Sequence, residues 1–305
     1  MRIVTNPGSN LSDAEISRYG ITITPQHLVV DGVEHDTRKR LPTFIVDDWV
    51  ARSAAFPHLV GTTASEFAQS FATLGRSDRE ILSVTTSRKV IQTYAASCTA
   101  AKTLRQSVEW EHLKIVTLDS GFTDIAAGLL VVAAAELGRR GMALEEVAAA
   151  LETLSAIGRM AIVPDRMDNL VKGGRASAFR GFLANIFEVK PLLGLRDGEL
   201  RLLRSVRRGE DRLALMVDEL AMVGAGRRVW IAIGHGNDPA RAEQLLKLFE
   251  TRFDVAYSVV RPLCTATYLH AGAGAVFACV LPIDSLPFAL PTPARADEPK
   301  ARLAS

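Results

Sequence analysis

The chain has 305 residues, of which 48% are hydrophobic and 23% charged, enough apolar material for one large core or for two. Lys and Arg total 36 against 34 Asp and Glu, a net charge of +2, and no basic run stands out, so nucleic acid is disfavoured as a partner. The three cysteines, Cys98, Cys264 and Cys279, form no CxxC pair and are expected to be reduced, buried thiols.

The chain begins with Met1-Arg-Ile-Val4, which has the pattern of a strand and carries no apolar leader segment. The longest apolar run, Ala126–Leu137, is too short to span a bilayer and is rich in alanine, as helices of soluble proteins are. We therefore expect a cytoplasmic protein with no integral membrane segment.

The first half of the chain alternates strand patterns with helix patterns. This order predicts βαβ units and a parallel sheet with helices on both faces. The predicted strands are Arg2–Thr5, Ile21–Thr24, Ile81–Thr85 and Leu113–Leu118. The predicted helices are Leu11–Arg18 with Ser12 as a possible N-cap, an amphipathic helix starting near Ser65, Lys89–Ser107 and Thr123–Arg139.

The carboxyl ends of the predicted strands carry polar side chains. Ligands of parallel sheets bind beyond these ends, where Thr5-Asn6, Thr86-Ser87 and Asp119-Ser120 fall. We therefore expect a binding site at this edge of the first sheet.

A domain boundary is predicted at Gly158, where the helix pattern Leu144–Ile157 ends. Hairpin and crossover patterns follow, so residues 159–285 are predicted to form a second α/β domain with a mixed sheet after an N-terminal α/β domain of residues 1–158. Residues 286–305 are rich in Pro, Ala and charge and are expected to lack fixed structure. The predicted elements are strands Met160–Val163, Gly198–Leu203, Val229–Ile233, Val255–Val260 and Ala275–Leu281, a short helix capped by Asp165 and closing at Gly173-Gly174, and helices Glu210–Met222 and Pro239–Phe253.

Thr62 and Thr63 immediately precede the helix that starts near Ser65. Their hydroxyl groups either cap this helix or donate hydrogen bonds to an anion at its N-terminus, where free amides and the helix dipole favour negative charge. Spacing alone gives the two alternatives equal weight.

Ser87 and Arg88 lie between a predicted strand and the following helix, as Asp119 and Ser120 do. Helix capping is the default role for Ser87, but its position makes it a candidate to face a ligand, and Arg88 could add a positive charge. Asp119 is expected to anchor its loop by accepting backbone amides.

His270 precedes Gly272 and Gly274, where the backbone can approach a ligand closely. Arg175 and Arg207 either form surface ion pairs or a face that recognises phosphate or a partner protein. The six histidines show no metal-ligand spacing, and the common nucleophile-elbow, P-loop and zinc-protease motifs are absent. We therefore predict neither a metal nor a cofactor.

Several segments, taken in chain order, form a recognisable series. They are Val4-Thr5-Asn6, Ile81–Tyr94, Asp119-Ser120, Leu170-Val-Lys-Gly-Gly-Arg175, Val189-Lys-Pro191, Ser205-Val-Arg207 and His270-Ala-Gly-Ala-Gly274. Together they resemble the DegV family of bacterial fatty-acid-binding proteins. The resemblance runs from Ile3 to about Leu281, and its glycine-arginine and lysine-proline elements are fairly specific.

The resemblance implies a two-domain α/β protein that holds one long-chain fatty acid in a tunnel between its domains. Thr62 or Thr63 and Ser87 would bind the carboxylate near His270 and Gly272. A separate fatty acid kinase would phosphorylate the carboxylate to an acyl-phosphate for phospholipid metabolism, with Arg175, Arg207 and His270 facing the kinase. The protein itself would be a carrier and not an enzyme.

The sequence departs from the family pattern mostly around the implied carboxylate site. Thr62-Thr63-Ala64 shortens a Thr-Ser-Gln-Pro segment, Ser87-Arg88 replaces a double serine, and Asn6 replaces an aspartate. Two alternatives therefore stay open. One is a small-molecule enzyme on the same fold that uses His270 with Asp119 or Ser120, and the other is a lipid carrier without kinase coupling.

Overall fold

Sheet A forms the centre of the N-terminal lobe in this computed structural model, which describes residues 1–164, 167–174, 190–207 and 209–293. Its four strands have the order β2-β1-β6-β7 and are all parallel, as predicted. Their carboxyl ends therefore meet at one edge. The strands are β1 Arg2–Thr5, β2 Thr22–Ile23, β6 Glu80–Thr85 and β7 Lys114–Asp119.

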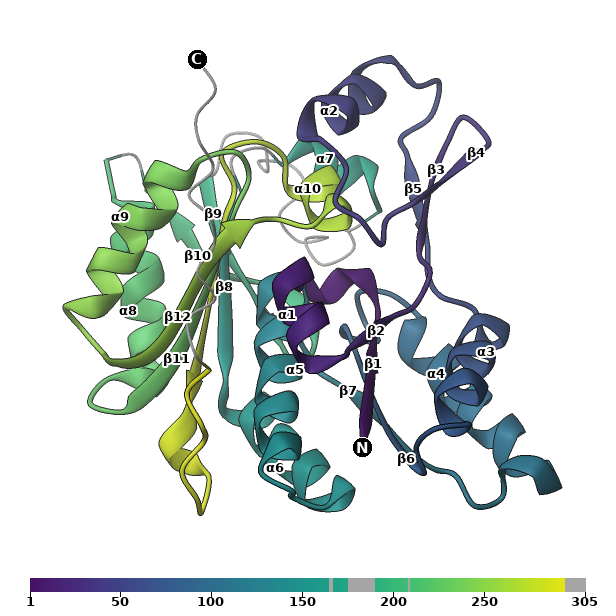
Figure 1. Cartoon of the computed structure of the whole chain (residues 1–305). Helices are drawn as coiled ribbons and strands as arrows, with labels where there is room; N and C mark the ends of the chain where they lie inside the picture. The colour runs from purple at the N-terminus through teal and green to yellow at the C-terminus, as the bar shows by residue number, and fades with distance from the viewer. Residues whose placement is uncertain (165–166, 175–189, 208, 294–305) are drawn as a thin grey trace.

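Helices α3 and α4 cover the outer face of sheet A (Figure 1). Ser12 caps α1 in a capping box with Glu15, which confirms the predicted cap. The helix predicted from Lys89 begins only at Thr93, and the residues before it form a turn in which the Ser87 carbonyl accepts the amides of Val90 and Ile91. The helices are α1 Asp13–Tyr19, α3 Ala64–Gly75 and α4 Thr93–Arg105, with short 3-10 turns η1 Pro7–Ser9 and η2 Val108–Trp110.

A small antiparallel sheet B and helix α2 lie between β2 and α3, and the sequence patterns did not predict them. The sheet has the order β4-β3-β5. Helix α2 packs against α10 (Thr265–Ala271) of the C-terminal lobe, beside which it lies in Figure 1. The elements are β3 His27–Val30, β4 Val33–Asp36, α2 Thr43–Arg52 and β5 His58–Val60.

The C-terminal lobe contains sheet C, with the order β10-β9-β8-β13-β11-β12. Only the β11–β12 pair among these neighbours is parallel, so the sheet is mixed, as predicted. Helices α8 and α9 cover its outer face. The strands are β8 Arg159–Val163, β9 Lys190–Arg196, β10 Glu199–Val206, β11 Arg228–His235, β12 Asp254–Pro262 and β13 Val276–Pro282; the helices are α7 Asp168–Lys172, α8 Arg212–Gly224, α9 Pro239–Glu250 and α10 Thr265–Ala271, with the 3-10 turn η5 Ile283–Ser285.

Helices α5 (Asp124–Arg139) and α6 (Leu144–Ile157) lie between the two sheets (Figure 1). Both contact strands of sheet A and strands of sheet C. Every residue of α5 from Asp124 to Leu137 is buried, because a sheet or another helix covers each of its faces. One continuous apolar core therefore joins the lobes. The predicted boundary at Gly158 falls where α6 ends and the chain enters sheet C.

The segment after sheet C corrects one expectation. A stretch without fixed structure was expected from residue 286, but Leu286 and Leu290 are buried in the shared core. The Ala289 carbonyl also accepts a hydrogen bond from Arg140 at 2.9 Å. The remainder of that stretch, from residue 294, lies outside the described residues.

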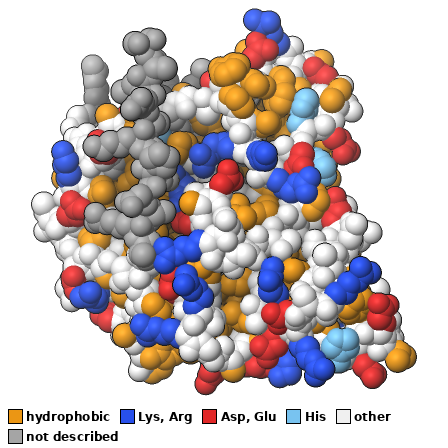
Figure 2. Space-filling view, in the orientation of Figure 1, with side chains coloured by type: hydrophobic (Ala, Val, Ile, Leu, Met, Phe, Trp, Pro, Cys, Tyr) orange, Lys and Arg blue, Asp and Glu red, His pale blue; other side chains and the backbone are white. Residues whose placement is uncertain are grey.

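In the part of the chain that the structure describes, no helix combines the length and the apolar character needed to cross a bilayer. On the face shown in Figure 2, Lys and Arg side chains are interspersed with Asp and Glu.

Candidate functional site

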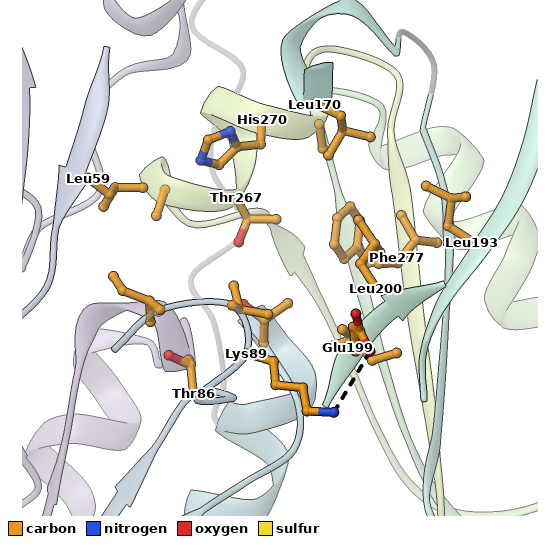
Figure 3. Close-up of a pocket in the computed structure, with 18 of the residues that line it drawn as sticks. Leu59, Thr86, Lys89, Leu170, Leu193, Glu199, Leu200, Thr267, His270 and Phe277 are labelled. Atoms are coloured by element: carbon orange, nitrogen blue, oxygen red, sulfur yellow. Dashed lines mark ion pairs between the residues drawn. The ribbon is translucent and has the colours of Figure 1, made fainter. Parts of the chain in front are cut away.

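A cavity of about 340 Å³ lies between the carboxyl edge of sheet A and the inner face of sheet C (Figure 3). This volume falls within the range of about 300–1,000 Å³ that is typical of small-molecule sites. Most of the wall is apolar: Leu59, Val90, Ile91, Ile162, Leu170, Leu193, Leu195, Leu200, Ala266, Ala271 and Phe277.

One end of the cavity is polar and is formed by Asn6, Gln26 and Thr86. Asn6 and Thr86 directly follow β1 and β6, and Gln26 follows β2, so parallel strands bring the three together. The Asn6 amide nitrogen donates to Gln26 Oε1 and to Thr86 Oγ1, both at 3.2 Å. The three side chains are buried, and their hydrogen bonds hold them in place.

An ion pair borders the polar end. Lys89 Nζ lies 3.8 Å from a carboxylate oxygen of Glu199, and both side chains are partly exposed. Figure 3 shows this pair on the same side of the cavity as Thr86. The pair links the loop after β6 with strand β10, and therefore links the two lobes beside the cavity.

Ser87, a predicted carboxylate ligand, contacts the opposite lobe. Its hydroxyl donates to the Gly198 carbonyl at 2.6 Å, and Gly198 belongs to the turn between β9 and β10. Ser87 is fully buried and is not among the residues that line the cavity. The hydroxyl proton is thus used to hold the hairpin against the N-terminal lobe.

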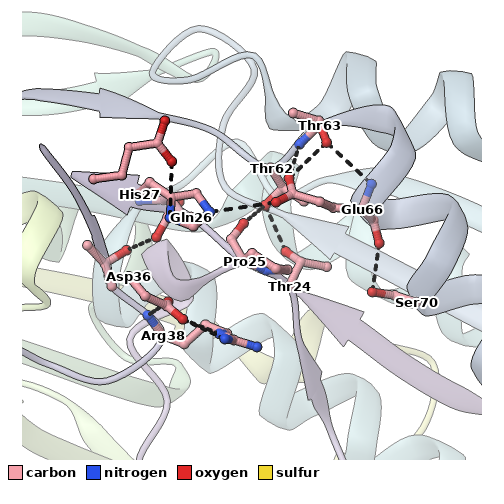
Figure 4. A network of polar contacts seen from close by, with 12 residues as sticks. Thr24, Pro25, Gln26, His27, Asp36, Arg38, Thr62, Thr63, Glu66 and Ser70 are labelled. Carbon is pink, nitrogen blue, oxygen red and sulfur yellow. Dashed lines mark hydrogen bonds and ion pairs between the residues drawn. The ribbon is translucent and has the colours of Figure 1, made fainter. Parts of the chain in front are cut away.

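Thr62 and Thr63 belong to a neighbouring polar network (Figure 4). The Thr62 hydroxyl donates to the Pro25 carbonyl at 2.6 Å and lies 2.8 Å from Thr24 Oγ1. Thr63 caps α3 in a capping box with Glu66. Of the two alternatives for these residues, the helix cap is realised by Thr63. A contact of either threonine with an acid stays a prediction.

His270 lies on α10 and lines the cavity at the end away from Lys89 (Figure 3). A side chain at position 173 would collide with its imidazole ring, so only glycine allows α7 to approach this closely. Gly272 has a φ of +75° and ends α10, with its amide donating to the Tyr268 carbonyl at 2.8 Å. The sequence motif thus contributes His270 to the cavity wall and Gly272 to the helix end.

A hydrogen bond between Tyr268 of α10 and Asp47 of α2 supports this side of the cavity. The sequence patterns did not predict it. The Tyr268 hydroxyl donates to the Asp47 carboxylate, with distances of 3.0 and 2.9 Å to its two oxygens. Burial and this hydrogen bond raise the pKa of Tyr268 above its ordinary value. The hydroxyl therefore stays protonated and keeps α2 docked on the helix that carries His270.

Arg88, Asp119 and Ser120 form a loop network beside the cavity. Asp119 accepts the backbone amides of Arg88 at 3.3 Å and Gly121 at 3.0 Å, which confirms the expected anchoring role, and it pairs with the exposed Arg88 guanidinium at 3.4 Å. The Ser120 hydroxyl donates to the Phe122 carbonyl at 3.1 Å. None of the three residues lines the cavity as His270 does.

Of the two arginines expected to face a kinase, only Arg207 belongs to the described residues. Arg207 is exposed at the end of β10, and its backbone amide donates to Glu210 Oε2 at 2.6 Å. Arg175 lies outside the described residues. Their role toward a partner stays a prediction.

The described residues contain no group of three or more His, Cys, Asp and Glu side chains arranged to hold a metal ion. The cavity wall offers amide, hydroxyl and imidazole groups with one lysine and one glutamate. Chemically, this arrangement suits a ligand with a long apolar part and a small polar head.

Sequence comparison finds one family along almost the whole chain. A model described as "Uncharacterised protein, DegV family" matches residues 1–282. A DegV domain-containing protein of Mycobacterium tuberculosis (strain ATCC 25618 / H37Rv) is 28% identical over 282 residues, which cover 91% of this chain and 96% of the relative. Another from Staphylococcus aureus (strain N315) is 25% identical over 288 residues, which cover 92% of this chain and 98% of the relative.

Solved structures share the fold. A DegV family protein from Thermus thermophilus, described by its fatty acid binding, has a TM-score of 0.84 at 22% identity and covers 92% of this chain and 100% of its own. DegV from Bacillus subtilis, described as a fatty acid binding protein, has a TM-score of 0.78 at 20% identity and covers 92% and 98%. This likeness confirms the predicted fold class.

Proposed function

The chain belongs to the DegV family, and from this premise we propose that it binds one long-chain fatty acid in the cavity between sheets A and C. The observation that carries the proposal is the cavity itself, which has an apolar wall and a polar end. Similar folds from Thermus thermophilus and Bacillus subtilis are described as fatty acid binding. The acyl chain would lie along Leu193, Leu195 and Phe277, and the carboxyl group would point to the polar end.

The energetics favour such a ligand. Each methylene group moved from water into an apolar wall contributes about 0.8 kcal/mol, so a long chain can be held strongly. The carboxyl group needs hydrogen-bond donors when it loses water. We propose that residues at the polar end surround it; the contacts predicted for Thr62, Thr63, Ser87, His270 and Gly272 stay part of the proposal.

We further propose that the protein is a carrier that presents the acid to a fatty acid kinase, without catalysing a reaction itself. The kinase would form an acyl-phosphate for phospholipid metabolism, and we propose that this step takes place in the cytoplasm, where ATP could supply the phosphoryl group. The polar end is suited to such access because Lys89 and Glu199 beside it are partly exposed. Arg175 and Arg207 would face the kinase.

Mass spectrometry of an organic extract tests the binding proposal. The protein purified without added lipid is expected to release a long-chain fatty acid at close to one equivalent, because such a ligand dissociates slowly from an apolar cavity. If the extract holds no acid, and the protein binds none when it is added, the proposal is wrong.

Kinase coupling is tested separately with the substitutions Arg175→Ala and Arg207→Ala. We expect each to lower the rate of acyl-phosphate formation by a fatty acid kinase about tenfold or more while the affinity for the acid is unchanged, because arginines are enriched among the few interface residues whose truncation costs about 2 kcal/mol or more. Arg228→Ala, an exposed arginine at the start of β11, is the control. Equal loss of acid binding and phosphorylation would contradict the docking role.

A further inference from the structure

The amide group of Gln26 has an orientation that its neighbours determine. The backbone N–H of Thr86 donates to Asn6 Oδ1 at 3.1 Å. A backbone N–H can only donate, so this atom of Asn6 must be the oxygen, and the Asn6 nitrogen is the donor to Gln26 at 3.2 Å. The atom of Gln26 that faces Asn6 is therefore Oε1, and Nε2 is directed away from Asn6.

Among the described residues, Gln26 Nε2 is left as a hydrogen-bond donor without an acceptor. Gln26 is only 1% exposed and lines the cavity. Its Oε1 and its backbone carbonyl are used by Asn6 and Thr37, but within the described ranges no residue accepts a hydrogen bond from Nε2. An amide donor on a cavity wall costs free energy when a ligand displaces water from it and offers no acceptor, so the molecule that fills the cavity is expected to supply one.

The hydroxyl groups that the sequence motifs indicate are already used as donors. Ser87 donates to Gly198 and Thr62 donates to Pro25. Lys89, the lysine of the cavity wall, is paired with Glu199. Gln26 is thus the better-placed donor for an oxygen atom at the polar end.

We infer that Gln26 Nε2 donates a hydrogen bond to a carboxyl oxygen of the bound acid, and that the cluster of Asn6, Gln26 and Thr86 is the headgroup subsite. Asn6 positions Gln26 and fixes which end of its amide meets the ligand. The inference rests on the proposed binding of a fatty acid and adds the residue that recognises the acid group. An amide donor distinguishes a carboxyl group from an apolar chain end without a buried positive charge.

The substitution Gln26→Glu tests this assignment, because it keeps the acceptor for Asn6 and replaces the donor by a second oxygen. Full-length protein freed of lipid would be titrated with hexadecanoic acid and with hexadecanol by displacement of a fluorescent fatty acid. We expect Q26E to weaken acid binding about tenfold or more and to change alcohol binding less than about threefold, because a hydroxyl group can donate to the new carboxylate. Gln69→Glu, on the exposed side of α3, is the matched control and should bind both ligands as the unsubstituted protein does.

Equal weakening of acid and alcohol binding by Q26E would overturn the assignment, as would unchanged acid binding. If Q26E does not fold, the side-chain amide resonance of Gln26 in the unsubstituted protein gives a second measurement. The resonance is expected to shift when hexadecanoic acid is added, and no shift would overturn the assignment. Binding of neither ligand by the unsubstituted protein would instead reject the proposed function, which the titration distinguishes from a failure at Gln26 alone.

Discussion

The pair of Glu15 on α1 and Arg261 on β12 joins the two lobes at the level of single residues. Two guanidinium nitrogens of Arg261 donate to the two carboxylate oxygens of Glu15 at 2.6 and 2.7 Å. The residues are 8% and 6% exposed. Burial acts to raise the pKa of Glu15, but the hydrogen bonds and charge of Arg261 outweigh it, so the pKa is lowered overall.

Replacing Glu15 by Gln is expected to destabilise the protein strongly, because the substitution removes the carboxylate that neutralises the buried Arg261 guanidinium. We expect the free energy of unfolding at pH 7, measured in urea, to fall by about 3 kcal/mol. The exposed pair of Arg228 and Asp254 is the control, and Asp254→Asn should change the free energy by no more than about 1 kcal/mol.

The pair of Glu15 and Arg261 also predicts how stability depends on pH. A carboxyl group with a lowered folded pKa stabilises the protein above its unfolded pKa, which is about 4.3 for Glu, and this stabilisation is lost as the pH falls through the folded value. The difference between the unsubstituted protein and E15Q should therefore shrink below about pH 4. A difference that is small at pH 7, or that does not shrink in acid, would show that the pair contributes little.

At the residue scale, the sequence predicts where the site lies better than which atoms form it. Ligands bind beyond the carboxyl ends of parallel strands, so the positions of Asn6 and Thr86 after β1 and β6 predict that both lie at the site. Gln26, which follows β2, could have been found in the same way. The direction of the Ser87 hydroxyl could not be predicted, because its acceptor Gly198 is 111 residues away in the chain. Such long-range partners depend on how the lobes pack.

At the scale of elements, the β3–β4 and β9–β10 hairpins have the same type of turn but different surroundings. The turns Asp31-Gly32 and Asp197-Gly198 both place two residues at positive φ, as two-residue hairpin turns of this type require. A Cβ atom at Gly198 would lie 2.5 Å from Ser87 Oγ, whereas one at Gly32 would meet nothing within 4 Å. The β9–β10 turn therefore docks on the other lobe, and the β3–β4 turn is open.

This difference predicts separate effects of alanine at the two glycines. Gly198→Ala and Gly32→Ala should each lower the free energy of unfolding by about 1–2 kcal/mol through backbone strain. Only Gly198→Ala is expected to speed release of a bound fatty acid, by about fivefold, because it disrupts a hydrogen bond that closes the lobes beside the cavity. Stopped-flow release of a fluorescent fatty acid measures this rate. Equal release rates in the two variants would show that the hairpin does not restrain the ligand.

The long elements follow from the sequence, and the short ones do not. Helix Leu144–Ile157 was predicted with its observed bounds, because its apolar residues recur with the helical period and Gly158 follows its last residue. Sheet B was missed because its strands are short and β4 is mostly exposed. Helix α10 has seven residues, and its burial depends on α2, which lies more than 200 residues earlier.

At the scale of the whole molecule, α5 makes the two lobes one structure. Its carboxylate Asp124 accepts hydrogen bonds from Asn10 at 2.7 Å and from the amide of Cys264 at 3.0 Å, so it contacts both lobes. A side chain at Gly128 would collide with the Ser9 carbonyl, which shows how closely η1 approaches this helix. The apolar run of α5 is visible in the sequence, but its burial by two sheets is a property of the assembled fold.

The shared core also positions the cavity. Helices α5 and α6 fill the space between the sheets, and the cavity remains at the carboxyl edge of sheet A, where polar residues meet the apolar face of sheet C. The proposed ligand therefore has a defined direction, with its acid group near Gln26 and its methyl end near Phe277.

A crystal structure with 16-bromohexadecanoic acid tests this direction most directly, because anomalous scattering locates the bromine at the far end of the chain. We expect the bromine peak beside Leu193, Leu195 and Phe277, with density for the carboxyl group within hydrogen-bond distance of Gln26. A bromine peak at the Asn6–Thr86 end, or a cavity that holds no acid at saturating ligand, would contradict the account.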